Sequence, residues 1–396
     1  MRLQKVVALP PQPERIWQCA LHPTLPLLAT ASSDKTARIT SLRTYTPLST
    51  IEGGHKRSIR SVAWKPGLTG ESVLATGSFD ATIGIWRRYE RDSQSPDTHG
   101  GDEEEEWRFA VVLDGHESEV KSVAWSAGGN LLATCSRDKT VWIWEELDED
   151  NFETIAVLQE HTQDVKFVAW HPEEELLASA SYDDTVRLYR EDVDDWTCCS
   201  LLSGHTSTVW CVEFEKPRSP LYDSTRSSRL ATCSDDLSVR VWTRISTSGS
   251  AAVVKAPPSV LRGDPIEEEW VQTATLPKIH TRAIYTVSWS ARTGRIASCG
   301  GDGRIVVYEE LPPSSPAETA PLPEAGDEKN GAAKSEWKVI AEVEGAHGVF
   351  EVNCVQWSKR WDKKGKLDGE GNDNDEILVS CGDDGVVNIW ELVDGT

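Results

Sequence analysis

The chain has 396 residues, and 41 Lys and Arg against 64 Asp and Glu give it a formal net charge of −23. This negative charge disfavours a nucleic-acid backbone or an anionic membrane as a partner, and we expect neither. The N-terminus lacks the apolar region of a signal peptide, and no apolar run approaches the roughly 18 to 20 residues that cross a bilayer. The nine cysteines lack the paired spacing of a disulfide framework or a zinc site. We therefore expect a soluble protein of the reducing cytoplasm, with the nucleus as a second location.

The first predicted element is a Val-rich strand over Leu3–Leu9, and seven copies of one pattern follow it. Each copy has Ser or Gly, any residue, and then Asp, at Asp34, Asp80, Asp138, Asp183, Asp236, Asp302 and Asp384. A hydroxyl residue stands four positions before each Asp, at Thr30, Thr76, Thr134, Ser179, Thr232, Ser298 and Ser380. Six positions after the Asp come Thr40, Trp86, Trp144, Tyr189, Trp242, Tyr308 and Trp390. A His precedes the last six copies, at His55, His116, His161, His205, His280 and His347.

The pattern resembles the WD-repeat signature and predicts an all-β fold. Between the His and the Asp, apolar and polar residues alternate, as in Val120–Trp125, which indicates half-buried strands, four in each copy. Seven copies predict a seven-bladed WD-repeat β-propeller as a single domain over residues 1–396. We expect the strand Leu3–Leu9 to become the outer strand of the seventh blade, so that the two chain ends close the ring.

The spacing of polar residues, repeated from copy to copy, predicts a buried hydrogen-bond relay. In the third copy, Asp138 in a tight turn is expected to bond to the ring of His116. The His ring engages the hydroxyl of Thr134, which also meets the indole N–H of Trp144. Such a network is stable only when every member is satisfied.

Three copies depart from this relay. Tyr189 and Tyr308 are expected to replace the indole donor with a phenol. The first copy carries Thr40 and has no His before it. We therefore expect the first blade to lack the complete relay and to be the weakest.

Long polar inserts divide the two faces of the predicted ring. They lie at 88–106, 243–269, 309–336 and 358–375, with a shorter one at 216–229. All fall between the first and second or the third and fourth strands of a blade, on the side that we call the insert face. The opposite side, formed by the loops with His and the turns with Asp, is the turn face. Acidic runs at 102–106, 145–150 and 191–195 predict a strongly negative insert face, whereas the uninterrupted turn face is a reasonable binding surface.

Three positions in each copy are predicted to project onto the turn face near the channel. Two of them are the residue before the Asp and the residue five after the His, for which Trp17 holds the analogous place in the first copy. These candidates are Trp17, Arg60, Phe79, Lys121, Arg137, Lys166, Tyr182, Trp210, Asp235, Tyr285 and Asp383. Arg and aromatic residues are enriched at interaction hot spots, and clustered Arg and Lys suit a carboxylate or an acidic segment. Taken by itself, Arg137 is more typical of a solvated surface charge than of a binding residue, but its predicted place on the turn face favours a role in binding.

The sequence predicts no catalytic residue, cofactor or metal. It has no Gly-rich phosphate loop, nucleophile elbow or metalloprotease helix, and the six repeated histidines belong to the relay. The cysteines at one equivalent position of four copies are interpreted as small core residues: Cys135, Cys233, Cys299 and Cys381. Because equivalent positions in separate blades do not converge, we expect no zinc or iron-sulfur site.

Blades 3 to 5 carry a more specific resemblance. Residues 130–145 (NLLATCSRDKTVWIWE), 161–165 (HTQDV), 176–189 (LLASASYDDTVRLY), 194–196 (DDW) and 205–210 (HTSTVW) resemble the WD-repeat proteins of cytosolic iron-sulfur protein assembly, abbreviated CIA. Blades 1, 2, 6 and 7 agree in outline only. The long inserts depart from the compact family pattern, which indicates a lineage-specific version.

The resemblance implies a non-enzymatic scaffold of the CIA targeting complex, which recruits apoproteins and assembly factors for cluster insertion. Its implied partners are a small CIA adaptor protein, a HEAT-repeat CIA scaffold, a hydrogenase-like Fe-S carrier and Fe-S apoprotein clients, with the chain as a monomer in this hetero-complex. The resemblance also transfers the functionally important Arg of this face to Arg137. The alternatives are another WD-repeat substrate receptor or adaptor, in a ubiquitin ligase or on chromatin, and a propeller enzyme.

Overall fold

The computed structural model describes residues 1–89, 106–192, 195–217, 227–245, 267–311, 334–362 and 376–394. These residues form strands and no helix. Blade 1 contains β2 (Ile16–Leu21), β3 (Leu27–Ser32), β4 (Ala37–Ser41) and β5 (Pro47–Ile51). Blade 2 contains β6 (Ile59–Trp64), β7 (Glu71–Ser78), β8 (Ile83–Tyr89) and β9 (Arg108–Leu113). Blade 3 contains β10 (Val120–Trp125), β11 (Leu131–Ser136), β12 (Val141–Asp148) and β13 (Asn151–Leu158).

The remaining blades follow the same order along the chain. Blade 4 contains β14 (Val165–Trp170), β15 (Leu176–Ser181), β16 (Thr185–Asp192) and β17 (Asp195–Ser203). Blade 5 contains β18 (Val209–Phe214), β19 (Arg229–Ser234), β20 (Val239–Arg244) and β21 (Trp270–Thr275). Blade 6 contains β22 (Ile284–Trp289), β23 (Ile296–Gly300), β24 (Ile305–Glu310) and β25 (Trp337–Val343). Blade 7 contains β26 (Val352–Lys359), β27 (Glu376–Gly382), β28 (Val387–Val393) and β1 (Arg2–Ala8).

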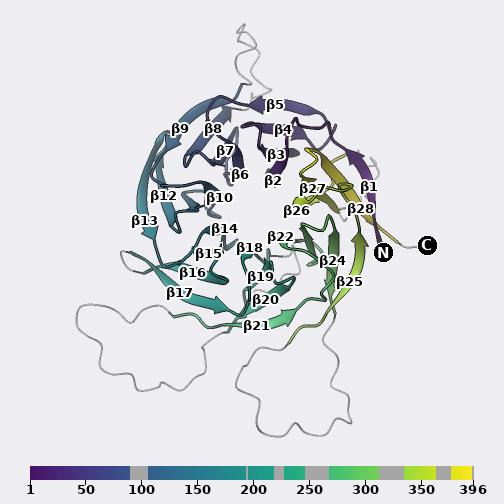
Figure 1. Ribbon diagram of the computed structural model, residues 1–396. Coiled ribbons are helices and arrows are strands. Elements are labelled where there is room, and N and C mark those ends of the chain that lie inside the picture. The colour runs from purple at the N-terminus through teal and green to yellow at the C-terminus, as the bar shows by residue number, and fades with distance from the viewer. Residues whose placement is uncertain are drawn as a thin grey trace, which may run out of the picture.

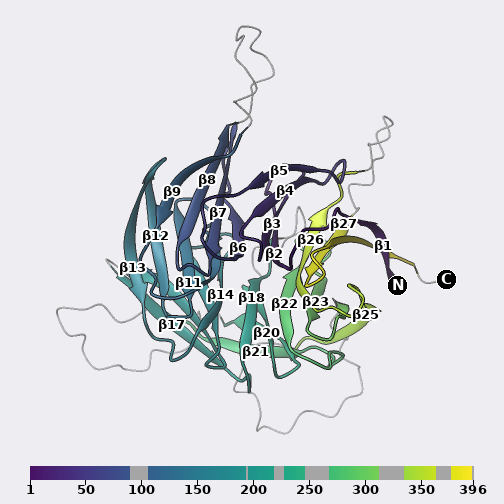
Figure 2. The same cartoon turned by 45° about the horizontal axis from the view of Figure 1, so that its top comes forward.

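The seven four-stranded antiparallel sheets form a β-propeller, as predicted (Figure 1). The first strand of each blade lines the central channel, and the last strand forms the rim. In blade 7 the strand order is β1-β28-β27-β26, so the N-terminal strand pairs with the C-terminal one, with Leu3 opposite Leu392. Figure 2 shows β1, in purple, beside the yellow strands of this blade. The predicted closure of the ring is therefore confirmed.

Neighbouring blades share their hydrophobic cores. Ala29 and Ile39 of blade 1, for example, pack in one buried cluster with Ile59, Val62 and Leu74 of blade 2. A single blade has two apolar faces and cannot bury both by itself. The packing between successive blades is therefore the main source of the stability of the ring.

The hydrogen-bond relay forms in blade 3 as predicted. His116 Nδ1 lies 2.8 Å from Asp138 Oδ2, His116 Nε2 lies 2.9 Å from Thr134 Oγ1, and Trp144 Nε1 donates to the same hydroxyl at 3.0 Å. Burial alone would raise the pKa of Asp138, but the hydrogen bonds from His116 and Thr140 outweigh it and hold this pKa well below its ordinary value. The same three contacts occur in blades 2, 5 and 7.

The three departing blades differ from one another. In blade 1, Gln12 stands 22 residues before Asp34, where other blades have His, and its Nε2 donates to Thr30 Oγ1 at 2.6 Å. The prediction that Tyr189 replaces the indole donor is wrong, because its buried hydroxyl makes no hydrogen bond within the described chain. A phenol hydroxyl extends from the tip of its ring, so it lies farther from the backbone and points in another direction than an indole N–H. The hydroxyl of Tyr308 lies 3.5 Å from Ser298 Oγ, which is a weak contact.

Each relay Asp is followed by a residue in the left-handed backbone region. Blades 6 and 7 use glycine there, Gly303 (φ 72°) and Gly385 (φ 70°), whereas blades 1 to 5 use residues with side chains, as at Lys139 (φ 74°). The strain of a side chain in this region is offset by the Asp carboxylate, which accepts hydrogen bonds from the backbone N–H and the hydroxyl of Thr140 in blade 3. The tight turn therefore depends on the Asp as well as on the relay.

Buried arginines link neighbouring blades near the insert face. Arg229 on β19 donates to both carboxylate oxygens of Glu215 in its own blade, at 2.7 and 2.8 Å, and to Glu310 of blade 6 at 2.7 Å. Arg87 on β8 makes an ion pair with Glu146 of blade 3. Glu146 belongs to the acidic run 145–150. Because Arg87 neutralises it, this part of the insert face is less negative than expected. Most of each long insert lies outside the described residues.

Candidate functional site

A β-bulge in every blade positions the side chains of the turn face. Pairing between the first and second strands shifts register around residues 17, 60, 121, 166, 210, 285 and 353. A bulge places one extra residue outside the regular pairing and redirects its side chain. These are the residues predicted from their spacing to the His, and the repeated bulge explains why they share one ring around the channel.

A stack of cationic and aromatic side chains extends over blade 1, from Asp383 of blade 7 to Phe79 of blade 2. Arg15 NH1 lies 3.3 Å from Asp383 Oδ2, and its guanidinium lies 5.1 Å from the ring centroid of Trp17. Arg60 lies 5.2 Å from the same ring. Trp17 in turn lies 5.9 Å from Phe79, centroid to centroid. Cation–π contacts at such distances favour a fixed arrangement of these side chains.

Lys121 continues this stack into blade 3. Its Nζ lies 4.5 Å from the ring centroid of Phe79. Burial, with a smaller contribution from the positive charges of Arg60 and Lys166, lowers the pKa of Lys121 to about 8 against the opposing effect of Glu119. A cluster of like charges is thus concentrated beside the channel and incompletely neutralised by this chain.

Arg137 is the most accessible of the predicted cations of this group. Its side chain is 59% exposed, and its NH1 approaches Glu119 at 3.4 Å. Arg57, 3.8 Å from the same carboxylate, shares it. One carboxylate at such distances binds two guanidinium groups weakly, so both are available to another acidic group.

In blades 4 to 6 the turn face consists mainly of aromatic and acidic residues. Lys166 Nζ lies 5.0 Å from the ring of Tyr182 and 5.2 Å from that of Trp210. Trp210 Nε1 donates to Asp235 Oδ1 at 2.6 Å, and its ring meets that of Tyr285 edge to face at 5.4 Å. The two acidic candidates are therefore paired within this chain. Asp235 accepts from Trp210, and Asp383 pairs with Arg15.

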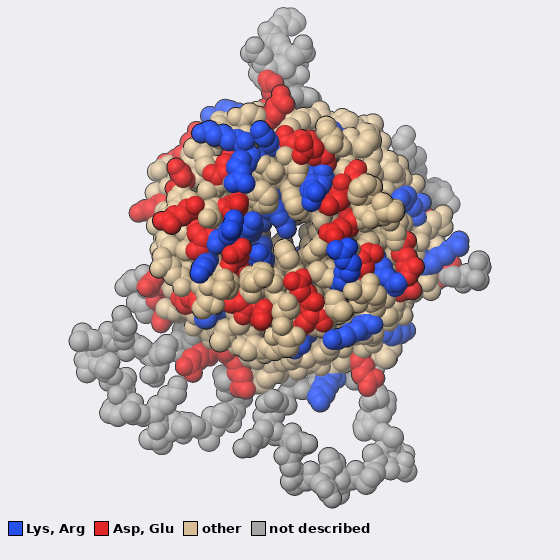
Figure 3. Space-filling model, in the orientation of Figure 1, with Lys and Arg blue, Asp and Glu red and all other residues tan. Residues whose placement is uncertain are grey.

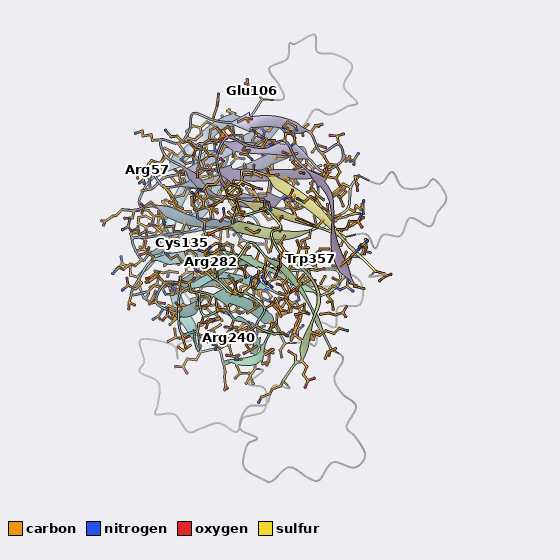
Figure 4. All side chains as sticks on the ribbon, turned by 45° about the vertical axis from the view of Figure 1, so that its right-hand side comes forward. Arg57, Glu106, Cys135, Arg240, Arg282 and Trp357 are labelled. Carbon is orange, nitrogen blue, oxygen red and sulfur yellow. The ribbon has the colours of Figure 1, made fainter. Side chains whose placement is uncertain are left out.

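Blade 7 joins the two ends of this ring of contacts. The hydroxyl of Tyr285 donates to Glu351 at 2.8 Å, and Arg282 lies 3.1 Å from the same carboxylate. Asn353 Nδ2 donates to Asp383 Oδ1 at 2.8 Å. In Figure 4, Arg57 and Arg282 lie toward the left side of the disc, and Trp357, at the end of β26, lies nearer the other side.

The structure thus brings all eleven candidates of the turn face together around the channel. Figure 3 shows Lys and Arg gathered on the side of the central opening formed by β6, β10 and β14. Sequence reasoning missed the charged residues that neutralise or extend this ring: Arg15, Arg57, Glu119, Asp164 (3.2 Å from Lys166), Arg282 and Glu351. All of them lie between the relay His or Gln12 and the first strand of a blade, and this position is the signal that would have found them.

The structure shows a convergence of cysteines that the sequence did not predict. Cys19, Cys354 and Cys381 are buried, and their sulfur atoms all lie within 4.8 Å of one another. These three cysteines do not occupy equivalent positions of their blades. The inner strand of a blade packs against two strands of the neighbouring blade, so non-equivalent positions converge there.

Comparisons with known proteins agree with the fold. The family model described as "WD domain, G-beta repeat" matches residues 4–41, 45–87, 107–145, 152–190, 196–243, 270–309 and 337–391. A protein of Aspergillus flavus named "Probable cytosolic iron-sulfur protein assembly protein 1" is 50% identical, over 97% of this chain and 96% of its own length. Proteins of the same name from Penicillium rubens and Coccidioides immitis are 48% and 47% identical over the same shares of both chains.

These similarities extend over nearly the whole chain, well beyond the segments in blades 3 to 5 that first indicated a relationship. Within the described ranges, no helix is long and apolar enough to span a membrane. The WD repeats and the near-complete coverage at about 50% identity show that the chain belongs to the family of cytosolic iron-sulfur protein assembly protein 1.

Proposed function

We propose that this protein is a non-enzymatic scaffold of the cytosolic iron-sulfur protein assembly machinery and that its turn face is the docking surface. The names of its relatives support the process. The observation that carries the proposal is the set of cations that lie over aromatic rings around the channel, namely Arg15 on Trp17, Lys121 on Phe79 and Lys166 on Trp210. Rigid aromatic residues beside incompletely paired cations have the composition of an interaction hot spot.

The chemistry of the turn face favours an acidic partner segment. Arg57 and Arg137 share the single carboxylate of Glu119, so a partner carboxylate would complete their pairing. Lys121, with its pKa lowered to about 8, would regain an ordinary pKa on contact with such a group. Planar guanidinium groups bind carboxylates with two parallel hydrogen bonds, which adds orientation to affinity.

In this proposal the chain is a monomeric subunit of the CIA targeting complex in the cytoplasm, with the nucleus as a second location. Its partners are the small adaptor protein, the HEAT-repeat scaffold, the hydrogenase-like cluster carrier and the apoprotein clients. The clusters remain on those partners, and the propeller brings carrier and client together. No residue of the turn face is assigned a catalytic role.

Co-purification with charge-reversed variants tests this proposal. Arg137→Glu should fold normally and lose at least one of these assembly factors, because it places a negative charge where an acidic segment would bind. Arg108→Glu is the matched control, because Arg108 is 51% exposed on the rim strand β9 and also lies 3.4 Å from a carboxylate, that of Asp150. It should retain every partner.

Two results would contradict the proposal. If Arg137→Glu and Arg108→Glu recover the same partners, the turn face is not the docking surface. If the wild-type chain recovers a cullin adaptor or histones in place of iron-sulfur assembly factors, the chain serves another complex. Turnover of an ester, phosphate or glycoside that is abolished by a substitution on the turn face would instead reveal an enzyme.

A further inference from the structure

Three thiols meet where the last blade of the ring packs against the first. Cys19 lies on β2 of blade 1, Cys354 on β26 and Cys381 on β27 of blade 7. None is more than 1% exposed. Their sulfur atoms are within 4.8 Å of one another, and those of Cys19 and Cys354 are 3.8 Å apart.

The other seams of the ring show how specific this arrangement is. Blade 5 has cysteines at the two positions equivalent to Cys354 and Cys381, namely Cys211 and Cys233, which are paired across the strands. The position equivalent to Cys19 in the next blade is Val287, whose carbonyl is contacted by Cys211 Sγ. Among the described residues, the group of three thiols at the seam between blades 7 and 1 is the one set of possible ligands that converges on a point.

The spacing of the three sulfur atoms fits a single ion. A metal bound to three thiolates at about 2.3 Å holds its sulfur atoms about 4 Å apart. The 3.8 Å between Cys19 and Cys354 already matches this value, and small rotations of side chains would bring the third sulfur to it. An iron-sulfur cluster distributes its cysteines over several iron atoms and spreads them more widely, so these thiols do not fit a cluster.

The surroundings select the kind of ion. The three cysteines belong to an aliphatic cluster that includes Ile16, Leu28 and Val379, and no His or carboxylate joins them in the part of the chain that the structure describes. Structural zinc sites take four ligands, whereas soft thiolates without oxygen or nitrogen ligands favour Cu(I), which accepts three. We propose that Cys19, Cys354 and Cys381 form a three-coordinate site for a soft monovalent cation of the Cu(I) type.

Such a site would join the two blades at which the ring closes. Blade 7 contains both chain ends, through β1 and β28. A cation that binds the closed ring and not the opened one stabilises the closed form by mass action. Each thiol that becomes a thiolate ligand releases its proton to solvent, and because the copper is supplied as Cu(I), no oxidant or reductant takes part.

Copper titration of the full-length reduced chain tests the site. Under anaerobic conditions with a colorimetric Cu(I) chelator as competitor, the wild type should bind one more Cu(I) per chain than Cys19→Val or Cys381→Ala. These variants take the residues that blades 6 and 4 have at the equivalent positions, Val287 and Ala180, which keeps the packing compatible with folding. The matched controls Cys135→Ala and Cys233→Ala should bind as much Cu(I) as the wild type.

X-ray absorption of the loaded wild type should show three sulfur neighbours and no nitrogen or oxygen, and its melting temperature should rise with Cu(I). This measurement needs no variant, so it remains decisive if a variant does not fold. Equal binding by the wild type and Cys19→Val would overturn the site, as would a shell with nitrogen or oxygen. Retention of zinc in its place would overturn the choice of cation, and a Cys19–Cys354 disulfide in protein purified without reductant would assign the pair to redox chemistry.

Discussion

The two faces of this propeller use arginine in opposite ways. Arg229, near the insert face, has a side chain that is only 4% exposed, and it donates to two glutamates of two blades. Arg137, on the turn face, is 59% exposed and shares the carboxylate of Glu119 with Arg57. A buried guanidinium that donates four hydrogen bonds to two glutamates, as Arg229 does, contributes to the integrity of the ring, whereas an exposed and weakly paired one remains available. The distinction therefore lies in burial and pairing, and the residue type alone does not reveal it.

The largest expected effect is that of removing the buried arginine. Arg229→Ala leaves Glu215 and Glu310 without the cation that they share between blades 5 and 6, and should lower the free energy of unfolding by about 3 to 5 kcal/mol. Urea denaturation measures this loss. Arg282→Ala on the turn face removes an exposed ion pair with Glu351 and a hydrogen bond to the carbonyl of Gly301, and should change the free energy of unfolding by less than about 1 kcal/mol. Equal losses in the two variants would show that the two faces do not differ in this way.

The second largest loss of stability is expected when the turn Asp is removed, and it should be larger in a blade with a complete relay than in blade 1. Asp138 accepts four hydrogen bonds, from His116, Glu117 and twice from Thr140, so Asp138→Ala should cost about 1 to 3 kcal/mol. Among the described residues, Asp34 of blade 1 accepts from Thr36 alone, through its N–H and hydroxyl, and Asp34→Ala should cost about half as much. Thermal and urea denaturation of both variants test the order. A larger loss for Asp34→Ala would refute the view that blade 1 depends less on its turn.

Acid should weaken the relay at the turn face. Burial opposes ionisation of Asp302, but hydrogen bonds from His280 and the backbone lower its pKa from 3.8 to about 2. A carboxyl with a lowered folded-state pKa stabilises the ring above the unfolded value, and this contribution disappears as the pH falls from about 4 through 2. Urea denaturation between pH 5 and pH 2.5 should show a shallower loss for Asp302→Asn than for the wild type. Parallel profiles would contradict this role.

The smallest expected effect on stability is at the proposed docking surface. Arg137→Met retains the aliphatic part of the side chain and removes only the contact with Glu119, so the free energy of unfolding should change by less than about 0.5 kcal/mol. A loss above 2 kcal/mol in urea denaturation would show that Arg137 belongs to the framework of the ring. The proposed role in docking would then need another residue to carry it.

The repeat made most of the fold predictable, because the spacing of Asp, hydroxyl and aromatic residues fixes the turns and strands of every blade. The same spacing located all eleven side chains of the turn face. It did not identify Gln12 as the residue that replaces the relay His, because a pattern search for His discards an amide that fills the same place. The buried arginines and the group of three cysteines were also missed, since they join residues of neighbouring blades far apart in sequence. Such contacts depend on the packing between sheets, which no local pattern encodes.

The pairing of β1 with β28 has a consequence for the order of events during synthesis. The strand β1 leaves the ribosome before the other strands of the ring, and its partner follows almost 390 residues later, which at about 5 to 20 residues per second is a delay of roughly 20 to 80 s. During this time the flank of blade 1 that contains Ile16 and Cys19 has no blade to cover it. A nascent chain in this state exposes apolar surface and unpaired strand edges, so the interval before closure is when it most needs protection by chaperones.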